Sequence, residues 1–196
     1  MLVKSYIQVM PILKEISNEA KRKCYDDAMK IIDDFCAINN IKKPKISLLD
    51  NKKCDSKGYY QPTTKRIYVL PKNCSVPTKK PGFSWSYPGY KADVTPFGVL
   101  LHEFGHYMHY IYYRPEYSAL AKNEKVSSYE PNEGERIAET FKLFLGNPDL
   151  LKKICPLRYK LMIKSGLKPV IKKSWQKVLE NAHPDFHNAI NNRISS

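Results

Sequence analysis

The chain lacks any apolar run long enough to cross a membrane. Its N-terminus, MLVKSYIQVMPILKE, also lacks the long apolar core and small-residue cleavage site of a signal peptide. We therefore expect a cytoplasmic protein with no membrane partner.

Cysteine patterning is equally sparse. The five cysteines are odd in number and contain no C-x-x-C pair, which argues against a zinc ribbon or a redox pair and favours reduced thiols. Internal repeats and low-complexity segments are absent too. What is present is a globular composition, with 42% hydrophobic and 12% aromatic residues in 196. This length predicts one domain spanning residues 1–196.

Acidic residues are outnumbered, because 33 Lys and Arg face 19 Asp and Glu, for a net charge of +14. This surplus favours acidic proteins or peptides as partners over basic ones. Nucleic acid remains an alternative that we do not predict, because the chain has no arginine-rich arm and no aromatic RNA-binding signature. A solvated basic surface without a dedicated partner is the simplest interpretation.

Hydrophobic periodicity and turn residues predict helices around a small sheet, an α+β fold. The first part, 17–94, should contain a helix at 17–38, a strand at 45–49, a hairpin at 58–70 and an ordered aromatic loop at 71–93. The second, 95–146, should contain a helix from Thr95 to about Tyr113 and another from about Asn132 to Gly146. The third, 147–196, should be helical at 150–164, interrupted by Pro156, and at 170–181.

The stretch LLHEFGHYMHY carries the chemistry. On its helix, Leu100, Phe104, Met108 and Ile111 form one stripe, and the histidines and Tyr113 form another on roughly the opposite side. His102 and His106, four residues apart, can converge on one metal ion. Glu103 projects about 100° away and can act on a metal-bound water as general base. Two histidine ligands with this glutamate are the zincin arrangement, although a buried histidine pair with an incidental glutamate is the alternative.

Two neighbours of these residues need separate explanations. Gly105 costs the helix about 1 kcal/mol relative to alanine, so we expect another backbone to pass close to it. His109 shares the histidine face but lies too far along the axis from His102 to bind the same ion. It is expected to contact a metal ligand or the substrate rather than the metal.

A third ligand is expected from the segment YEPNEGERIAETF at 129–141. Glu135 and Glu139 are four residues apart on one helix face, so one carboxylate can bind the metal and the other can orient a ligand histidine. The alternative is a capping box, in which Asn132 and Glu135 cap the helix and Glu139 is an exposed residue. Glu130 and Glu133 are rival ligands.

HEFGH followed by ERIAETF resembles the gluzincin metallopeptidases, and in particular the catalytic domain of anthrax lethal factor and the Pro-Pro endopeptidases. Ser128-Tyr129 and NEGERIAETF match the second half of that pattern, and the small ImmA/IrrE-type proteases share it more loosely. The resemblance implies a minigluzincin-like fold and one zinc bound by His102, His106 and Glu135. It also implies Glu103 as base, Glu139 as the support of a ligand and Tyr129 as the residue that stabilises the oxyanion.

The expected function is therefore zinc-dependent endopeptidase action on a protein or peptide, with the substrate extended along the 59–70 hairpin. Two alternatives stay open: a basic nucleic-acid-associated protein with structural zinc, and a non-catalytic binding protein on the same scaffold. His183 and His187, also four residues apart, are expected to be surface residues because they have no carboxylate pair nearby.

Overall fold

The computed structural model describes residues 18–49, 54–76, 92–112, 117 and 124–170. Within these ranges the chain forms five helices and three strands, which confirms the α+β class. The elements are α1 (Glu19–Ile38), β1 (Lys45–Leu48), β2 (Gly58–Gln61), β3 (Arg66–Val69), α2 (Pro96–Ile111), α3 (Glu133–Gly146), α4 (Pro148–Ile154) and α5 (Pro156–Lys164).

The sheet has the order β1-β3-β2. The predicted hairpin is confirmed, because β2 pairs antiparallel with β3 across a turn in which Lys65 has a positive φ of 51°. The parallel pairing of β1 with β3 was not predicted. It leaves β2 as an edge strand of the described sheet, and β2 is the strand that borders the candidate site.

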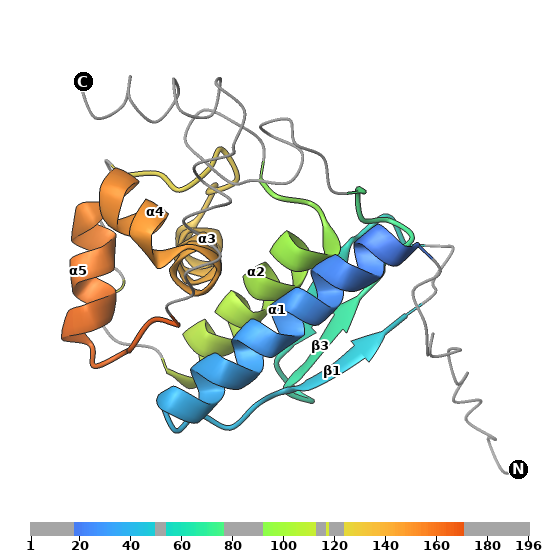
Figure 1. The fold of residues 1–196 in the computed structure, drawn as a ribbon, viewed down its shortest axis with the longest axis horizontal. Coiled ribbons are helices and arrows are strands. Elements are labelled where there is room, and N and C mark those ends of the chain that lie inside the picture. The colour runs from blue at the N-terminus through green and yellow to red at the C-terminus, as the bar shows by residue number, and fades with distance from the viewer. Residues whose placement is uncertain (1–17, 50–53, 77–91, 113–116, 118–123, 171–196) are drawn as a thin grey trace, which may run out of the picture.

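The helices form the core on one side of this sheet. In Figure 1, α1 and α2 run side by side, with the sheet on one side of the molecule and α4 and α5 on the other. Phe35 of α1 stands edge-on to Phe104 of α2 and Phe144 of α3, at centroid distances of 6.0 and 6.3 Å. All three rings are fully buried, so one aromatic cluster joins the three long helices.

Most predicted elements are confirmed to within two residues, including the break at Pro156 between α4 and α5. Residues 77–91 of the predicted aromatic loop, the predicted helix at 170–181 apart from its first residue, and Tyr113, His183 and His187 lie outside the described residues. One detail of the helical stripes is wrong. Ile111, expected on the packing face of α2, is 36% exposed because it is the last residue of the helix.

The five cysteines all lie within the described ranges, and each is a free thiol. Burial raises the pKa of the Cys36 thiol to about 11 and that of Cys74 to about 12. Among the described residues, no helix is both long and apolar enough to pass through a membrane.

Candidate metal centre

Two helices with well-defined starts bring the site together. Thr95 caps α2, where its hydroxyl accepts a hydrogen bond from the Gly98 N–H at 3.4 Å, and Pro96 follows in the first turn. Asn132 caps α3, where its side chain accepts from the Glu135 N–H at 3.0 Å. These caps fix where each helix begins and therefore which residues face the neighbouring helix.

The histidine face of α2 meets the glutamate face of α3. His102, His106 and Glu135 each offer one ligand atom, and the three atoms lie within 4.8 Å of one another. The Nε2 atoms of the two histidines are 3.1 Å apart. Glu135 Oε2 lies 2.9 Å from Nε2 of His102 and 3.5 Å from Nε2 of His106. The predicted grouping of these residues around a possible metal position is confirmed.

The donor set fits a zinc ion. Nitrogen and oxygen ligands at roughly 2.0–2.2 Å from a tetrahedral zinc lie about 3.3 Å from one another, close to the three spacings observed. Glu135 Oε2 is buried and has no hydrogen-bond partner among the described residues, although it lies against both imidazole nitrogens. A buried carboxylate oxygen aimed at two imidazole nitrogens, without a hydrogen bond of its own, has the environment of a metal ligand.

Glu139 orients one of these ligands. Its Oε1 lies 2.7 Å from Nδ1 of His102, and its side chain is fully buried. A proton held on Nδ1 by this carboxylate leaves the lone pair of Nε2 directed at the candidate metal position. The capping-box alternative is therefore half right: Asn132 does cap α3, but Glu139 is not exposed and Glu135 turns its carboxylate to the histidines.

A lysine and a serine surround Glu139, and neither was predicted. The Lys142 ammonium donates to both carboxylate oxygens of Glu139 at 2.5 and 2.6 Å, and the Ser127 hydroxyl donates to Oε2 at 2.5 Å. Lys142 is only 4% exposed. Its i+3 spacing from Glu139 on the buried side of α3 was the one sequence signal that could have identified it.

These contacts shift the pKa values of the ionisable groups around the candidate metal position. Burial alone would raise the pKa of Glu139, but Lys142 and His102 outweigh it and lower the pKa to about 2. Burial alone would lower the pKa of His102, but the Glu135 and Glu139 carboxylates raise it to about 9. The imidazoles of His102 and His106 hold the pKa of Glu135 well below its usual range. A metal ion arriving at this site would replace a proton on His102.

Glu103 lies beside the three candidate ligands and outside their group. It is 8% exposed, and burial raises the pKa of its carboxyl despite the neighbouring histidines. The backbone N–H of Tyr60 on β2 favours the ionised form of this carboxylate and partly opposes the rise in its pKa. A desolvated carboxylate with a raised pKa is suited to take up and return a proton.

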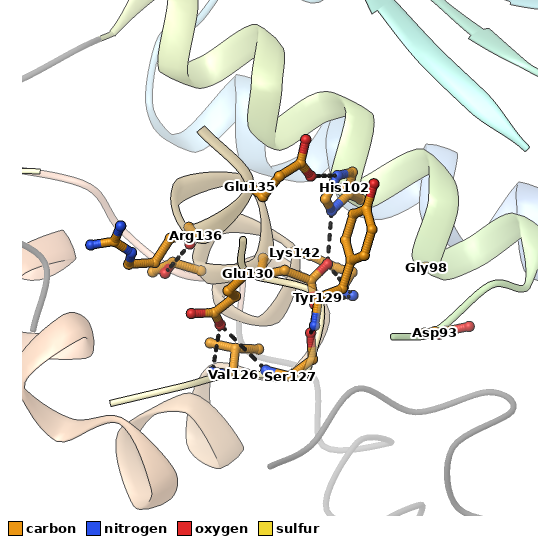
Figure 2. Close-up of polar contacts among 12 residues, drawn as sticks. Asp93, Gly98, His102, Val126, Ser127, Tyr129, Glu130, Glu135, Arg136 and Lys142 are labelled. Atoms are coloured by element: carbon orange, nitrogen blue, oxygen red, sulfur yellow. Dashed lines mark hydrogen bonds and ion pairs between the residues drawn. The ribbon is translucent and has the colours of Figure 1, made fainter. Parts of the chain in front are cut away.

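These residues open into a cavity of about 590 Å³. Its lining includes β2, the three candidate ligands, Glu103, His109, Tyr110 and Tyr129. Tyr129 is 51% exposed, and its ring lies alongside that of His102 at a centroid distance of 5.7 Å (Figure 2). His109 is half-buried in the cavity wall and is not among the three converging residues, consistent with the predicted geometry of α2.

The rival ligands Glu130 and Glu133 do not belong to the converging group. The carboxylate of Glu130 is instead paired with Arg158 of α5 at 2.8 Å. Comparison of the chain with protein-family models, curated proteins and solved structures finds no match.

Proposed function

We propose that the protein is a zinc-dependent endopeptidase of the gluzincin type, with His102, His106 and Glu135 holding the metal. The observation that carries the proposal is the convergence of these three side chains, with Glu139 behind His102, at the wall of an open cavity. A closed site with four protein ligands would indicate a structural zinc. Three ligands facing a cavity leave a position for water or substrate.

When bound, zinc would supply Lewis acidity, which lowers the pKa of water to about 7 and polarises a carbonyl group. The residues of the chain would perform the remaining tasks. Glu103 would take the proton of the attacking water and then pass it to the leaving amine. Glu139 would keep the proton on Nδ1 of His102, and the Tyr129 hydroxyl would donate to the carbonyl oxygen as negative charge develops on it.

The backbone of β2 offers a place for an extended peptide. Leu70 N–H donates to the Lys57 carbonyl at 2.8 Å, which makes these two residues a hydrogen-bonded pair of the antiparallel ladder. Because such pairs alternate, the backbone groups of Gly58 and Tyr60 point away from β3, towards the open edge. The Tyr60 N–H also lowers the pKa of Glu103, as expected if it faces that carboxylate and not β3.

A peptide strand added at this edge would therefore pair mainly with the Gly58 N–H and the Tyr60 carbonyl, next to the candidate base, because the Gly58 carbonyl already accepts from the Ser56 hydroxyl at 2.6 Å and the Tyr60 N–H faces Glu103. Gly58 is required there, because a Cβ would lie 2.6 Å from Val99 Cγ1 and 3.2 Å from Glu103 Cγ. Pro62, which follows β2, has no backbone N–H and would end the pairing with the peptide at that end of the strand. The net charge of +14 favours substrates with acidic residues around the cleaved bond.

The proposal is tested by profiling a peptide library with the zinc-loaded protein beside its Glu103→Gln variant. Cleavage that needs both zinc and Glu103 is the expected result. A protein in which zinc is structural and the basic surface binds nucleic acid would cleave no peptide. Its binding to nucleic acid would weaken steeply with salt and survive Glu103→Gln. Zinc content measured on both samples ensures that the comparison is between loaded proteins.

A further inference from the structure

We propose that Arg158 is a positioning residue, which acts through Glu130 to fix the segment 124–132 and so to hold Tyr129 beside the metal centre. Arg158 lies on α5, the last described helix. It touches none of the three candidate ligands, and no sequence pattern connects it with the site. The inference depends on the proposed function only for the catalytic meaning of Tyr129.

Arg158 is fully buried, which is rare for an arginine and demands partners. Its Nη1 and Nη2 atoms donate to the two carboxylate oxygens of Glu130 at 3.1 and 2.8 Å. Nη2 also donates to the backbone carbonyl of Glu124. The side-chain carboxylate of Glu124 accepts a hydrogen bond from the backbone N–H of Arg158 at 3.0 Å. The planar guanidinium of Arg158 therefore binds Glu124 and Glu130 together and holds the segment 124–132 against α5.

Glu130 passes this restraint to the turn before Tyr129. Its Oε1 accepts hydrogen bonds from the backbone N–H groups of Val126 at 2.6 Å and Ser127 at 3.3 Å, as Figure 2 shows. One carboxylate thus binds Arg158 on one side and two backbone donors on the other. Without the arginine, a largely buried carboxylate would hold this turn with no cation to balance its charge.

Ser127 connects the turn to the metal centre. Its hydroxyl oxygen accepts from the Tyr129 N–H at 3.1 Å and donates to Glu139, the residue that orients His102. The backbone of Tyr129 is therefore tied to the centre through Ser127 and to α5 through Glu130. The Tyr129 side chain is half exposed, so this backbone frame provides much of what positions its hydroxyl. A misplacement of about 1 Å can cost roughly 10²-fold in rate.

The test compares Glu130→Gln with Thr140→Val. The glutamine keeps an oxygen that can accept from Val126 and Ser127 but removes the charge that grips Arg158. Thr140→Val removes a different partner of Arg158, because the Thr140 hydroxyl accepts from Nη1 at 3.1 Å. Thr140 lies on α3 and not in the segment 124–132, so it serves as the matched control. Arg158→Lys, which keeps the charge and loses the fork, should behave like Glu130→Gln. Circular dichroism and zinc content establish that each variant is folded and loaded.

The first measurement needs no activity. 3-Fluorotyrosine placed at position 129 should give a ¹⁹F resonance displaced from that of the free residue in the zinc-loaded wild type and in Thr140→Val. In Glu130→Gln and Arg158→Lys the resonance should move towards the free position. A resonance unchanged by Glu130→Gln would overturn the inference.

The second measurement is kinetic. Glu130→Gln should lower kcat by about ten-fold or more, though no further than Tyr129→Phe does, with little change in KM. In the Tyr129→Phe background the same substitution should have no further effect, because there is no hydroxyl left to misplace. Equal losses in both backgrounds would overturn the inference. Two results together would separate the inference from the proposed function. If the ¹⁹F resonance moves in Glu130→Gln but Tyr129→Phe keeps full activity, the positioning role of Arg158 stands and the catalytic role of Tyr129 is refuted.

Discussion

Gly105 of α2 lies directly against Ala138 of α3, so close that a Cβ on the glycine would stand 2.7 Å from both the Cα and the carbonyl oxygen of the alanine. The expected close passage of another backbone at this mid-helix glycine is confirmed. Because His102 and His106 flank Gly105 and Glu135 lies one turn before Ala138, this contact sets the distance between the histidines and the glutamate. The glycine therefore shapes the candidate metal site as well as the packing of the two helices.

Gly105→Ala should therefore lower the free energy of unfolding by about 1–3 kcal/mol, the usual cost of overpacking, and weaken metal binding. Gly134→Ala is the matched control in α3, because its Cβ would meet nothing closer than 3.4 Å. That substitution should be neutral or stabilising by up to about 1 kcal/mol. Urea unfolding of the two variants provides the comparison, and equal stabilities would contradict the packing argument.

The metal content should be one zinc per chain, and alanine at His102, His106 or Glu135 should abolish stoichiometric binding. His109→Ala should retain the metal, because His109 lies outside the converging group. Zinc content after dialysis, measured by mass spectrometry, decides both points. Stoichiometric zinc in Glu135→Ala would reassign the third ligand.

Glu103→Gln should keep the fold and the zinc and lose peptide cleavage by at least ~10²-fold, because an amide cannot take a proton from the attacking water. The measurement is kcat/KM on a peptide identified by the library profile. Near-normal cleavage by a variant shown to hold zinc would rule out this base.

Tyr129→Phe should lower kcat by about 10²-fold with little change in KM, since the hydroxyl acts mainly in the transition state. Phenylalanine keeps the ring that lies beside His102, so a packing role alone would leave kcat nearly unchanged. Steady-state kinetics on a single peptide separate the two outcomes.

Asp93, which is not one of the three candidate metal ligands, offers a test of pH dependence. Burial raises the pKa of its carboxyl from 3.8 to about 7, although Lys142 and hydrogen bonds from Thr95 oppose the shift. The folded state therefore keeps a proton that the unfolded state has lost between these two values. The contribution of Asp93 to stability is complete below about pH 4 and falls as the pH rises to about 7.

Asp93→Asn should remove this loss while an amide oxygen still accepts from Thr95. Relative to the wild type, the variant should gain stability between about pH 4 and pH 8, by at most about 4 kcal/mol for a shift of this size. Urea unfolding of metal-free protein at the two pH values measures the gain. A stability difference independent of pH would show that folding does not raise the pKa of Asp93.

Local patterns predicted the parts of the site that a single helix determines. His102 and His106 converge because four residues make about one helical turn, and the same spacing puts Glu135 and Glu139 on one face. Lys142 was missed because its role depends on the burial of Glu139, which only the packing of α3 on α2 creates. Arg158 was missed because 28 residues separate it from Glu130. The β1–β3 pairing was missed for the same reason, since a strand does not encode its partner locally.

The short length of β2 should limit aggregation of the protein at high concentration. An open strand edge is a template on which other chains can stack, and long, flat edges promote aggregation. β2 offers only four residues and is followed directly by Pro62, which interrupts any growing ladder. In the proposed function, the same brevity would limit how firmly a cleaved fragment is held. An edge of this size would align a peptide for the proposed reaction without nucleating a fibre or retaining the products.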